Sequence, residues 1–301
     1  MSEILTKLIP VFLFFGLGMV LKRTRFADHG NGDFLLKLVF FVTLPSLVLL
    51  SLSQTVFTPD KLYLPLANII INLSCMGATL FVGKFQGVPD KTLGSMLTAT
   101  MITNNVFMFP FIIVGFGNSG FADAVLFDFG NGLTTATITY FLALKYGSGR
   151  GRFNTMLLKL CKSPLSWAFA AGIGLSVSST GLPGPLTMFL ESIGRMTSPL
   201  ILMALGIFFQ PRLSELKLVS ITILIRAGIG LCVGLGLAHA FGFTGHTFAV
   251  VALCSAAPVG FMTLTFAAIA GLDKEFASKT VSLSILLGIL YVPVLMFWFG
   301  V

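Results

Sequence analysis

The chain has 301 residues, of which 55% are hydrophobic and 10% are charged, and its mean hydropathy is +0.96. Soluble domains have about 25% charged residues, so this composition excludes an ordinary water-soluble fold. The net charge of +8 raises the alternative of a nucleic-acid partner, but the basic residues lie in loops between apolar segments, which argues against one.

Apolar segments of membrane-spanning length follow one another along the whole chain. About 20 residues of α-helix cross a hydrocarbon layer of about 30 Å. Because the segments are continuously apolar and do not alternate with polar residues, helices are predicted and not the strands of a closed barrel. The ten predicted helices comprise residues 4–21, 34–53, 62–83, 93–116, 122–144, 164–180, 186–208, 218–240, 246–270 and 276–299.

Basic residues are concentrated in alternate loops. The loops after predicted helices 1, 3, 5, 7 and 9 carry 14 Lys and Arg residues, whereas the opposite side has Lys7 and Lys61. The positive-inside rule therefore predicts a multi-pass protein of the cell (inner) membrane with both termini outside the cytoplasm. Topology and contact with anionic lipid account for the positive charge without a nucleic-acid partner.

Short motifs recur at a nearly constant distance along the chain. Thr43-Leu-Pro45 matches Thr197-Ser-Pro199 after 154 residues, and Gly16-x-Gly18 matches Gly172-x-Gly174 after 156. Because five is an odd number, a repeat of five helices must enter the membrane from the opposite side, as in many secondary transporters. The sequence predicts an all-α fold with a first five-helix repeat at 1–146, a cytoplasmic linker at 147–163 and an inverted repeat at 164–301.

Predicted helices 4 and 9 contain helix-breaking residues. Pro110 and Pro258 each lack a backbone donor and clash with the preceding turn. With an offset of 154, Pro258 corresponds to Asn104, so two interruptions are expected at matching depths near the bilayer midplane. The alternative is that both prolines only kink packed helices.

Two half-helix N-termini at such interruptions would present N–H groups and positive dipole ends to a carboxylate. Neutral Asn side chains would add donors without a buried charge. The predicted substrate-binding residues are Asn104, Asn105, Phe109, Pro110, Ala257, Pro258, Val259 and Gly260.

Ionisable residues inside the predicted helices are functional candidates, because each costs about 3 kcal/mol in hydrocarbon. Asp128 shares a face with Asn131, and it could carry a proton between the two faces or support the site by hydrogen bonding. Glu191 and Arg195 are spaced i, i+4, which predicts an ion pair, with anion attraction by Arg195 as the alternative. Arg226 is expected to extend its side chain to the helix end and reach water.

Several motifs together resemble the auxin efflux carrier family, which includes plant auxin exporters and bacterial dicarboxylate permeases. The resemblance implies a ten-helix fold similar to that of bile-acid and sodium/proton transporters. In that fold helices 1, 2, 6 and 7 form a scaffold, and helices 3–5 and 8–10 form a transport domain whose broken helices 4 and 9 cross. The residues that carry the resemblance are Asn105-x-x-x-x-Pro110 with Gly117, Phe127-Asp128-x-Gly130-Asn131, Pro199-Leu-x-Leu-x-x-x-Gly206 and Ala256-Ala257-Pro258.

These features predict a secondary active transporter of small organic anions, dicarboxylates or auxin-like acids, that uses alternating access of an elevator type. The chain lacks the large central loop of the long plant exporters, which favours small organic acids over auxin. The alternative is a sodium- or proton-coupled symporter or antiporter of bile-acid-symporter or cation/proton-exchanger type.

An enzyme is not expected, because the sequence shows no nucleophile–base pair. The four cysteines have no metal-site spacing, and neither a metal nor a cofactor is expected apart from a coupling proton or sodium ion. The expected partners are the organic anion and the lipid bilayer, with a homodimer left open.

Overall fold

The computed structural model describes residues 2–56, 58–148, 158, 161–178, 180–209 and 216–299. Helix accounts for 85% of the structure, and the described residues contain no strand, which confirms the predicted all-α class. Six helical stretches among these residues are long and apolar enough to span a membrane: Gly30–Ser53, Pro59–Gln86, Asn105–Tyr146, Gly184–Phe208, Lys217–Ala240 and Lys274–Trp298.

Each of the five helices predicted in the first half is helical in the structure. Helix α6 covers the end of predicted helix 4 and most of helix 5, and Gly117, with φ of +62°, turns the chain between them in a conformation that favours glycine. The elements are α1 (Ser2–Arg23), α2 (His29–Leu38), the π-helix η1 (Val39–Thr43), α3 (Leu44–Ser53), η2 (Pro59–Leu62), α4 (Tyr63–Gln86), α5 (Asp90–Met101), α6 (Asn105–Thr134), η3 (Thr135–Thr139) and α7 (Tyr140–Tyr146).

The five segments of the second half are also helical, although three of them are divided. Predicted helix 7 is α10 and α11, helix 8 contains a π-helix, and helix 9 is α14 and α15. The elements are α9 (Pro164–Val177), α10 (Gly184–Gly194), α11 (Thr197–Phe208), α12 (Leu216–Ile223), the π-helix η4 (Leu224–Ile229), α13 (Gly230–Ala240), α14 (Gly245–Ser255), α15 (Met262–Ala270) and α16 (Lys274–Trp298).

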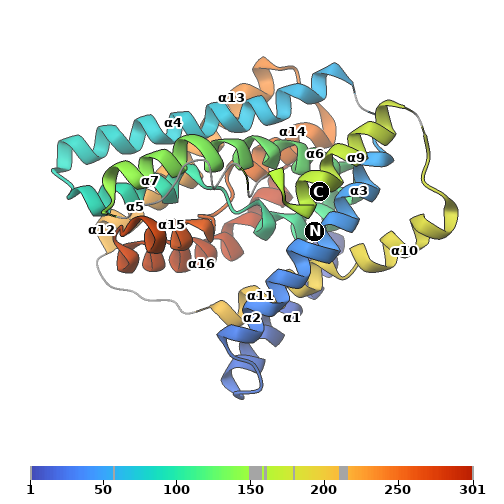
Figure 1. Cartoon of the computed structure of the whole chain (residues 1–301), viewed down its shortest axis with the longest axis horizontal. Coiled ribbons are helices and arrows are strands. Elements are labelled where there is room, and N and C mark those ends of the chain that lie inside the picture. The colour runs from blue at the N-terminus through green and yellow to red at the C-terminus, as the bar shows by residue number, and fades with distance from the viewer. Residues whose placement is uncertain are drawn as a thin grey trace.

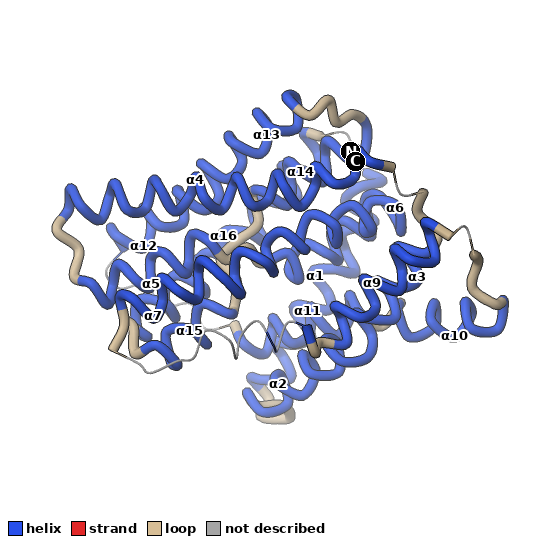
Figure 2. Tube along the Cα trace, turned by 45° about the horizontal axis from the view of Figure 1, so that its top comes forward, coloured by secondary structure: helices blue, strands red, loops and turns tan. Residues whose placement is uncertain are grey.

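The helices pack in two groups (Figure 1). In the first group α1 packs along α11, α3 along α9, and α2 and α10 beside them. The second group contains α4 to α7 and α12 to α16, and Figure 2 separates the same two groups in another orientation. Helix α6 contacts α1, α3 and α11, so it connects the two groups.

Glycine permits the closest contacts of the first group. A Cβ atom at Gly18 would lie 2.2 Å from the Met203 carbonyl oxygen of α11, and one at Gly172 would lie 2.7 Å from Cβ of Leu52 in α3. Gly16, two residues before Gly18, faces no atom within 4 Å. Small residues let helices approach closely in a membrane, so these two helix pairs depend on glycine.

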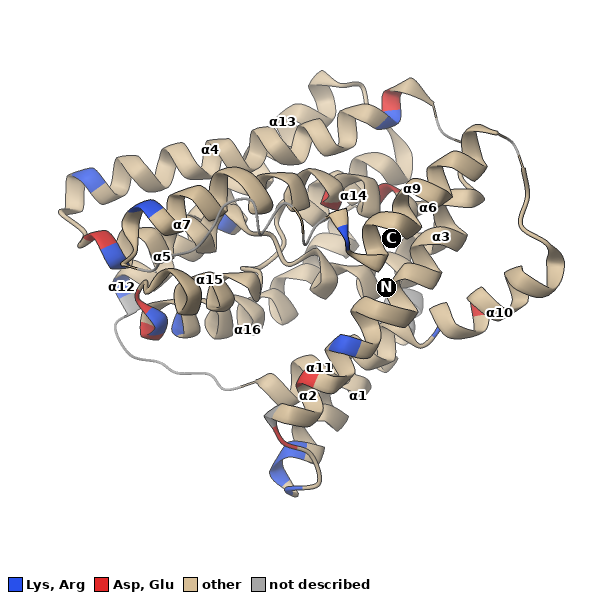
Figure 3. Cartoon of the chain, viewed as in Figure 1, with Lys and Arg blue, Asp and Glu red and all other residues tan. Residues whose placement is uncertain are grey.

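Charged residues gather at the ends of the helices, and the long middle parts carry few (Figure 3). Large apolar side chains are exposed along those middle parts, among them Phe41 and Leu290. An apolar outer surface between charged ends is typical of helices that contact lipid, as expected for a multi-pass membrane protein.

Candidate functional site

The interruptions of predicted helices 4 and 9 lie against each other. Between α5 and α6, and between α14 and α15, the chain leaves the helical conformation. The two segments run antiparallel, with Asn104 N–H donating to Pro258 O (2.9 Å) and Gly260 N–H donating to Ile102 O (2.8 Å). The expected crossing of two broken helices is therefore present.

The first interruption is not where Pro110 predicts it. Pro110 lies inside α6, and the helix is broken at residues 102–104, whereas Pro258 lies within the second break. The exchanged hydrogen bonds join Asn104 to Pro258 and Ile102 to Gly260. The two breaks therefore meet, although the proline expected to cause the first one lies inside a helix.

The backbone groups at the crossing have partners. Thr103 N–H donates to Asn131 Oδ1 (3.1 Å), and Asn131 Nδ2 donates to Thr103 O (3.2 Å). Val259 N–H donates to Ser284 Oγ (3.2 Å). The expectation of free amides was therefore wrong for the extended residues, because neighbouring helices supply side-chain partners for the groups that their own helices cannot pair.

Unpaired amides occur one step later, where the second half-helices begin. Asn104 caps α6 by accepting a hydrogen bond from Phe107 N–H (3.1 Å). Among the described residues, no partner is found for the N–H groups of Asn105 in α6 or of Phe261 and Met262 at the start of α15. These helix starts carry the partial positive charge that an anion prefers.

Asp128 lies beside the start of α6. Its Oδ1 atom accepts hydrogen bonds from Asn105 Nδ2 (2.7 Å) and Asn131 Nδ2 (2.8 Å). A small cavity of about 80 Å³ between α6 and the first group is bordered by Asp128 and Phe109. Asp128 and Asn131, which were predicted to share a face, are thus joined in one network with Asn105, and a carboxyl group already occupies the α6 side of the crossing.

A larger cavity of about 430 Å³ borders the start of α15. It lies between α2 and α11 of the first group and α15 and α16 of the second. Phe261, Ser278 and Ser282 are half-buried in its wall, and Thr265 and Asp33 are exposed. A volume of this size, with apolar walls and a few hydroxyl groups, suits a small organic ligand.

The predicted substrate-binding residues are buried in this conformation. Asn104 is 4% exposed and Asn105 is 1% exposed, and Phe109 is buried beside the small cavity. These residues surround the crossing, but none of them lines the large cavity. Phe261, which follows Gly260, does. Buried as well are Pro110, Ala257, Pro258, Val259 and Gly260.

The prediction for Arg226 was wrong. Its side chain does not reach water: the residue lies in η4 and is only 1% exposed. Nη1 donates to Asn72 Oδ1 (3.1 Å) and Thr100 O (3.0 Å), and Nη2 donates to Ser255 O (2.8 Å). The π-helix directs the guanidinium inward, to the crossing.

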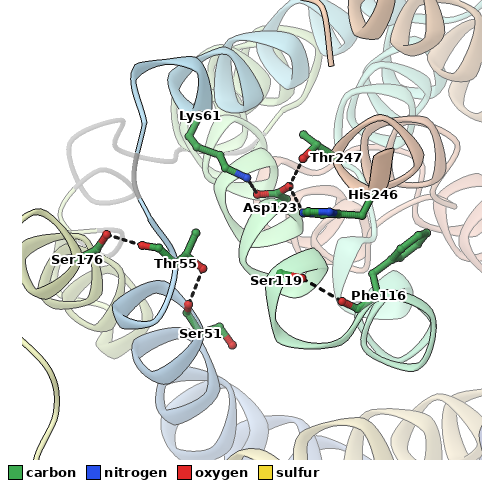
Figure 4. A network of polar contacts seen from close by, with 9 residues as sticks. All are labelled: Ser51, Thr55, Lys61, Phe116, Ser119, Asp123, Ser176, His246 and Thr247. Atoms are coloured by element: carbon green, nitrogen blue, oxygen red, sulfur yellow. Dashed lines mark hydrogen bonds and ion pairs between the residues drawn. The ribbon is translucent and has the colours of Figure 1, made fainter. Parts of the chain in front are cut away.

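A second buried carboxylate, which the sequence analysis missed, lies at the face predicted to be outside. Asp123 is fully buried and forms an ion pair with Lys61 (Figure 4). Its other oxygen accepts a hydrogen bond from Thr247 Oγ1 (2.6 Å) and lies 3.4 Å from His246 Nε2. The sequence places Lys61 near a loop and Asp123 near the end of another predicted helix, and no pattern in it indicates that the two side chains meet.

This outer network faces polar groups of the first group of helices. Ser176 Oγ donates to Thr55 O (2.5 Å), and Thr55 Oγ1 donates to Ser51 O (2.7 Å) (Figure 4). A cavity of about 420 Å³ is bordered by Ser51 and Thr55 on one side and by Lys61 and His246 on the other. The two helix groups are therefore separated by polar space at this end.

The predicted pair of Glu191 and Arg195 is confirmed, with 2.6 Å between Oε1 and Nη2. The Arg195 side chain is 76% exposed, and none of the three cavities described above includes it. Within the described ranges, no group of three His, Cys, Asp or Glu side chains is arranged to hold a metal ion.

Residues 150–296 match the family model described as "Membrane transport protein". An "Uncharacterized transporter" of Methanothermobacter thermautotrophicus is 24% identical over 284 residues, which cover 92% of each chain. The second half of the chain is thus similar to a family of membrane transport proteins, and nearly the whole chain is similar to a transporter. The predicted resemblance to auxin efflux carriers is thereby confirmed.

A further relative, "Uncharacterized transporter MJ1031" of Methanocaldococcus jannaschii, is 25% identical over 187 residues, 58% of this chain and 59% of that protein. Similarity to transport proteins favours solute movement over catalysis. In such a protein a crossing of interrupted helices is the expected place for a solute.

Proposed function

We propose that the protein is a secondary active carrier of small organic anions. The observation that supports it most is the start of α15, where the N–H groups of Phe261 and Met262 have no partner among the described residues and Phe261 lines a cavity of about 430 Å³. A helix N-terminus attracts a carboxylate through its N–H groups and its dipole. The hydroxyls of Ser278 and Ser282 would orient a second polar group of the solute.

The two sides of the crossing differ in a way that favours an anion at α15. At the start of α6 the carboxyl group of Asp128 already accepts hydrogen bonds from Asn105 and Asn131. At the start of α15 the corresponding part of α16 supplies serine, and Ser282 lines the large cavity. A solute carboxylate would meet no buried negative charge there, and the exposed carboxylate of Asp33 is screened by water.

The movement we propose is an elevator-type displacement of the second group of helices against the first, which serves as scaffold. The two groups meet through α6, with polar space at one end and the large cavity near the other. Sliding of the second group would carry the crossing from one cavity towards the other, which is alternating access.

We further propose that the two halves are inverted five-helix repeats, and equivalent contacts support this. Gly18 lies against Gly206, where α1 packs on α11, and Gly172 lies against Leu52, where α9 packs on α3. Gly18 and Gly172 are 154 residues apart, as are Leu52 and Gly206. A two-fold axis between the halves would superimpose the contact of Gly18 with Gly206 on the contact of Gly172 with Leu52.

Two polar pairs follow the same spacing. Thr43 ends the π-helix η1 and Thr197 begins α11 after the break that follows α10, and both hydroxyls are buried without a partner among the described residues. Asn72 and Arg226, also 154 residues apart, contact each other, as residues near a two-fold axis do. The offset from the sequence motifs thus recurs at Asn72 and Arg226, which belong to no shared motif.

Asp128 is the proposed site of proton coupling. Its hydrogen bonds come from two neutral amides, and it borders a cavity, so it can be reached by water when the groups move. A half-buried carboxyl group without a cationic partner among the described residues can exchange a proton at modest cost, in contrast to the fully buried Asp123, which is paired with Lys61.

Uptake into proteoliposomes tests the proposal. Labelled dicarboxylates and indole acids are offered with and without imposed pH and sodium gradients. Asn105→Ala removes a donor that holds Asp128 at the crossing and should lower uptake about tenfold or more, because the proposed movement carries the whole crossing. The control Asn118→Ala changes an exposed asparagine of the same helix and should retain uptake. Normal uptake by Asn105→Ala would refute the role of the crossing in transport.

A further inference from the structure

Arg226 joins the C-terminal ends of the two interrupted helices. Thr100 is in the last turn of α5, and Ser255 is the last residue of α14. The guanidinium donates to both carbonyl oxygens, at 3.0 Å and 2.8 Å. Last-turn carbonyls have no partner within their own helix, and they carry the partial negative charge of the helix dipole.

The positive charge of Arg226 has no acidic partner among the described residues. Its hydrogen-bond acceptors are Asn72 Oδ1 and the two carbonyl oxygens, and Nε is buried without a hydrogen bond. A buried charge must be compensated, and here two helix ends provide the compensation. The arrangement therefore stabilises one cation that is part of the chain.

The same arrangement of groups is suited to a free cation. Half-helix C-termini and unwound carbonyls at a helix crossing coordinate sodium ions in transporters with interrupted helices. Resting on the proposed carrier function, we propose that Arg226 is a built-in cation that takes the place of a coupling sodium ion at the crossing. The carrier therefore needs no sodium gradient.

Arg226 also reaches the opposite side of the crossing through a short chain of contacts. Asn72 Oδ1, which accepts from Arg226, also accepts a hydrogen bond from Thr103 Oγ1 (3.5 Å). Thr103 in turn pairs with Asn131, which donates to Asp128. The guanidinium thus positions the two α-helix ends relative to the start of α6, and its loss should loosen the crossing.

Removal of the guanidinium and its replacement by a small molecule test this role. Arg226→Ala should melt at a temperature several degrees below the wild type and lose about tenfold or more of its uptake. Millimolar methylguanidinium, far below denaturing concentrations, should restore both quantities in part. Arg195→Ala, which removes an exposed arginine, is the matched control. Its melting temperature and uptake should equal those of the wild type, with or without methylguanidinium.

Measurements on the wild type decide the inference even if Arg226→Ala does not fold. Uptake and melting temperature of the wild type should be equal in sodium, potassium and choline media, and Arg226→Lys should retain this independence. Stimulation of wild-type uptake about fivefold or more by sodium overturns the inference. A wild-type melting temperature in Arg226→Ala without methylguanidinium also overturns it.

The two proposals can fail separately. The melting temperature requires no transported solute, so rescue of Arg226→Ala by methylguanidinium supports the built-in cation even if none of the tested anions is carried. Anion uptake that requires sodium would leave the carrier function in place and refute the role of Arg226.

Discussion

Replacement of Asn131 by alanine should test how strongly the crossing depends on a single side chain. Asn131 makes three hydrogen bonds, accepting from Thr103 N–H and donating to Thr103 O and to Asp128 Oδ1. The alanine variant leaves the buried Thr103 backbone groups unpaired. At about 0.6 to 1 kcal/mol for each hydrogen bond, the loss is roughly 2 to 3 kcal/mol of unfolding free energy.

The assay is equilibrium unfolding in mixed micelles with increasing denaturing detergent. A loss of about 2 to 3 kcal/mol corresponds to a roughly 30- to 140-fold shift of the unfolding equilibrium. Asn118→Ala removes the same atoms from an exposed position on the same helix and should change the free energy by less than about 0.5 kcal/mol. Equal stabilities for the two variants would refute the reasoning, because the crossing would then hold without Asn131.

Three further predictions concern packing, coupling and the solute. Gly18→Ala should separate α1 from α11 and lower stability by about 1 to 3 kcal/mol, whereas Gly16→Ala, which meets open space, should not, as the same unfolding assay would show. Asp128→Asn should abolish uptake driven by a pH gradient but retain solute exchange at equal pH; persistent pH-driven uptake would exclude its role in coupling. Thr265→Val and Ser282→Ala should each raise the half-saturation concentration roughly fivefold, since each removes a hydroxyl from the large cavity. Unchanged values would place the solute elsewhere.

The helical segments could be predicted because their cause is local. A backbone in lipid must pair its own polar groups, and about 20 apolar residues in succession satisfy this requirement as a helix. All ten predicted segments are helical for this reason. The kink at Gly117 and the break at Pro258 also follow from local chemistry.

The break between α5 and α6 could not be located in this way. Residues 102–104 contain no proline, and Pro110 stands within a helix. The extended conformation at 102–104 exists because Pro258 and Gly260 offer hydrogen bonds from the other half of the chain, and because Asn131 pairs with Thr103. Such partners are distant in sequence and come together only on folding.

The candidate site was predicted in part. Asn105, Asp128 and Asn131 were singled out because polar groups in apolar helices are rare, and they form one network. Arg226 was misplaced because a residue near a helix end reaches water in most cases, and the π-helix that directs it inward has no evident sequence pattern. Asp123 was missed because its partner Lys61 belongs to another helix.

The sequence by itself determined that this chain is an all-helical membrane protein, that Pro258 interrupts predicted helix 9, and that a few polar side chains lie within apolar helices. The tertiary structure decided which backbone groups remain unpaired and where the large cavity lies. It also decided that Asp123 is paired with Lys61 and that Arg226 is paired with two helix ends. The reason is physical: helix formation in lipid is satisfied within one segment, whereas a buried charge or a broken helix can be stabilised only by groups that distant segments bring to it.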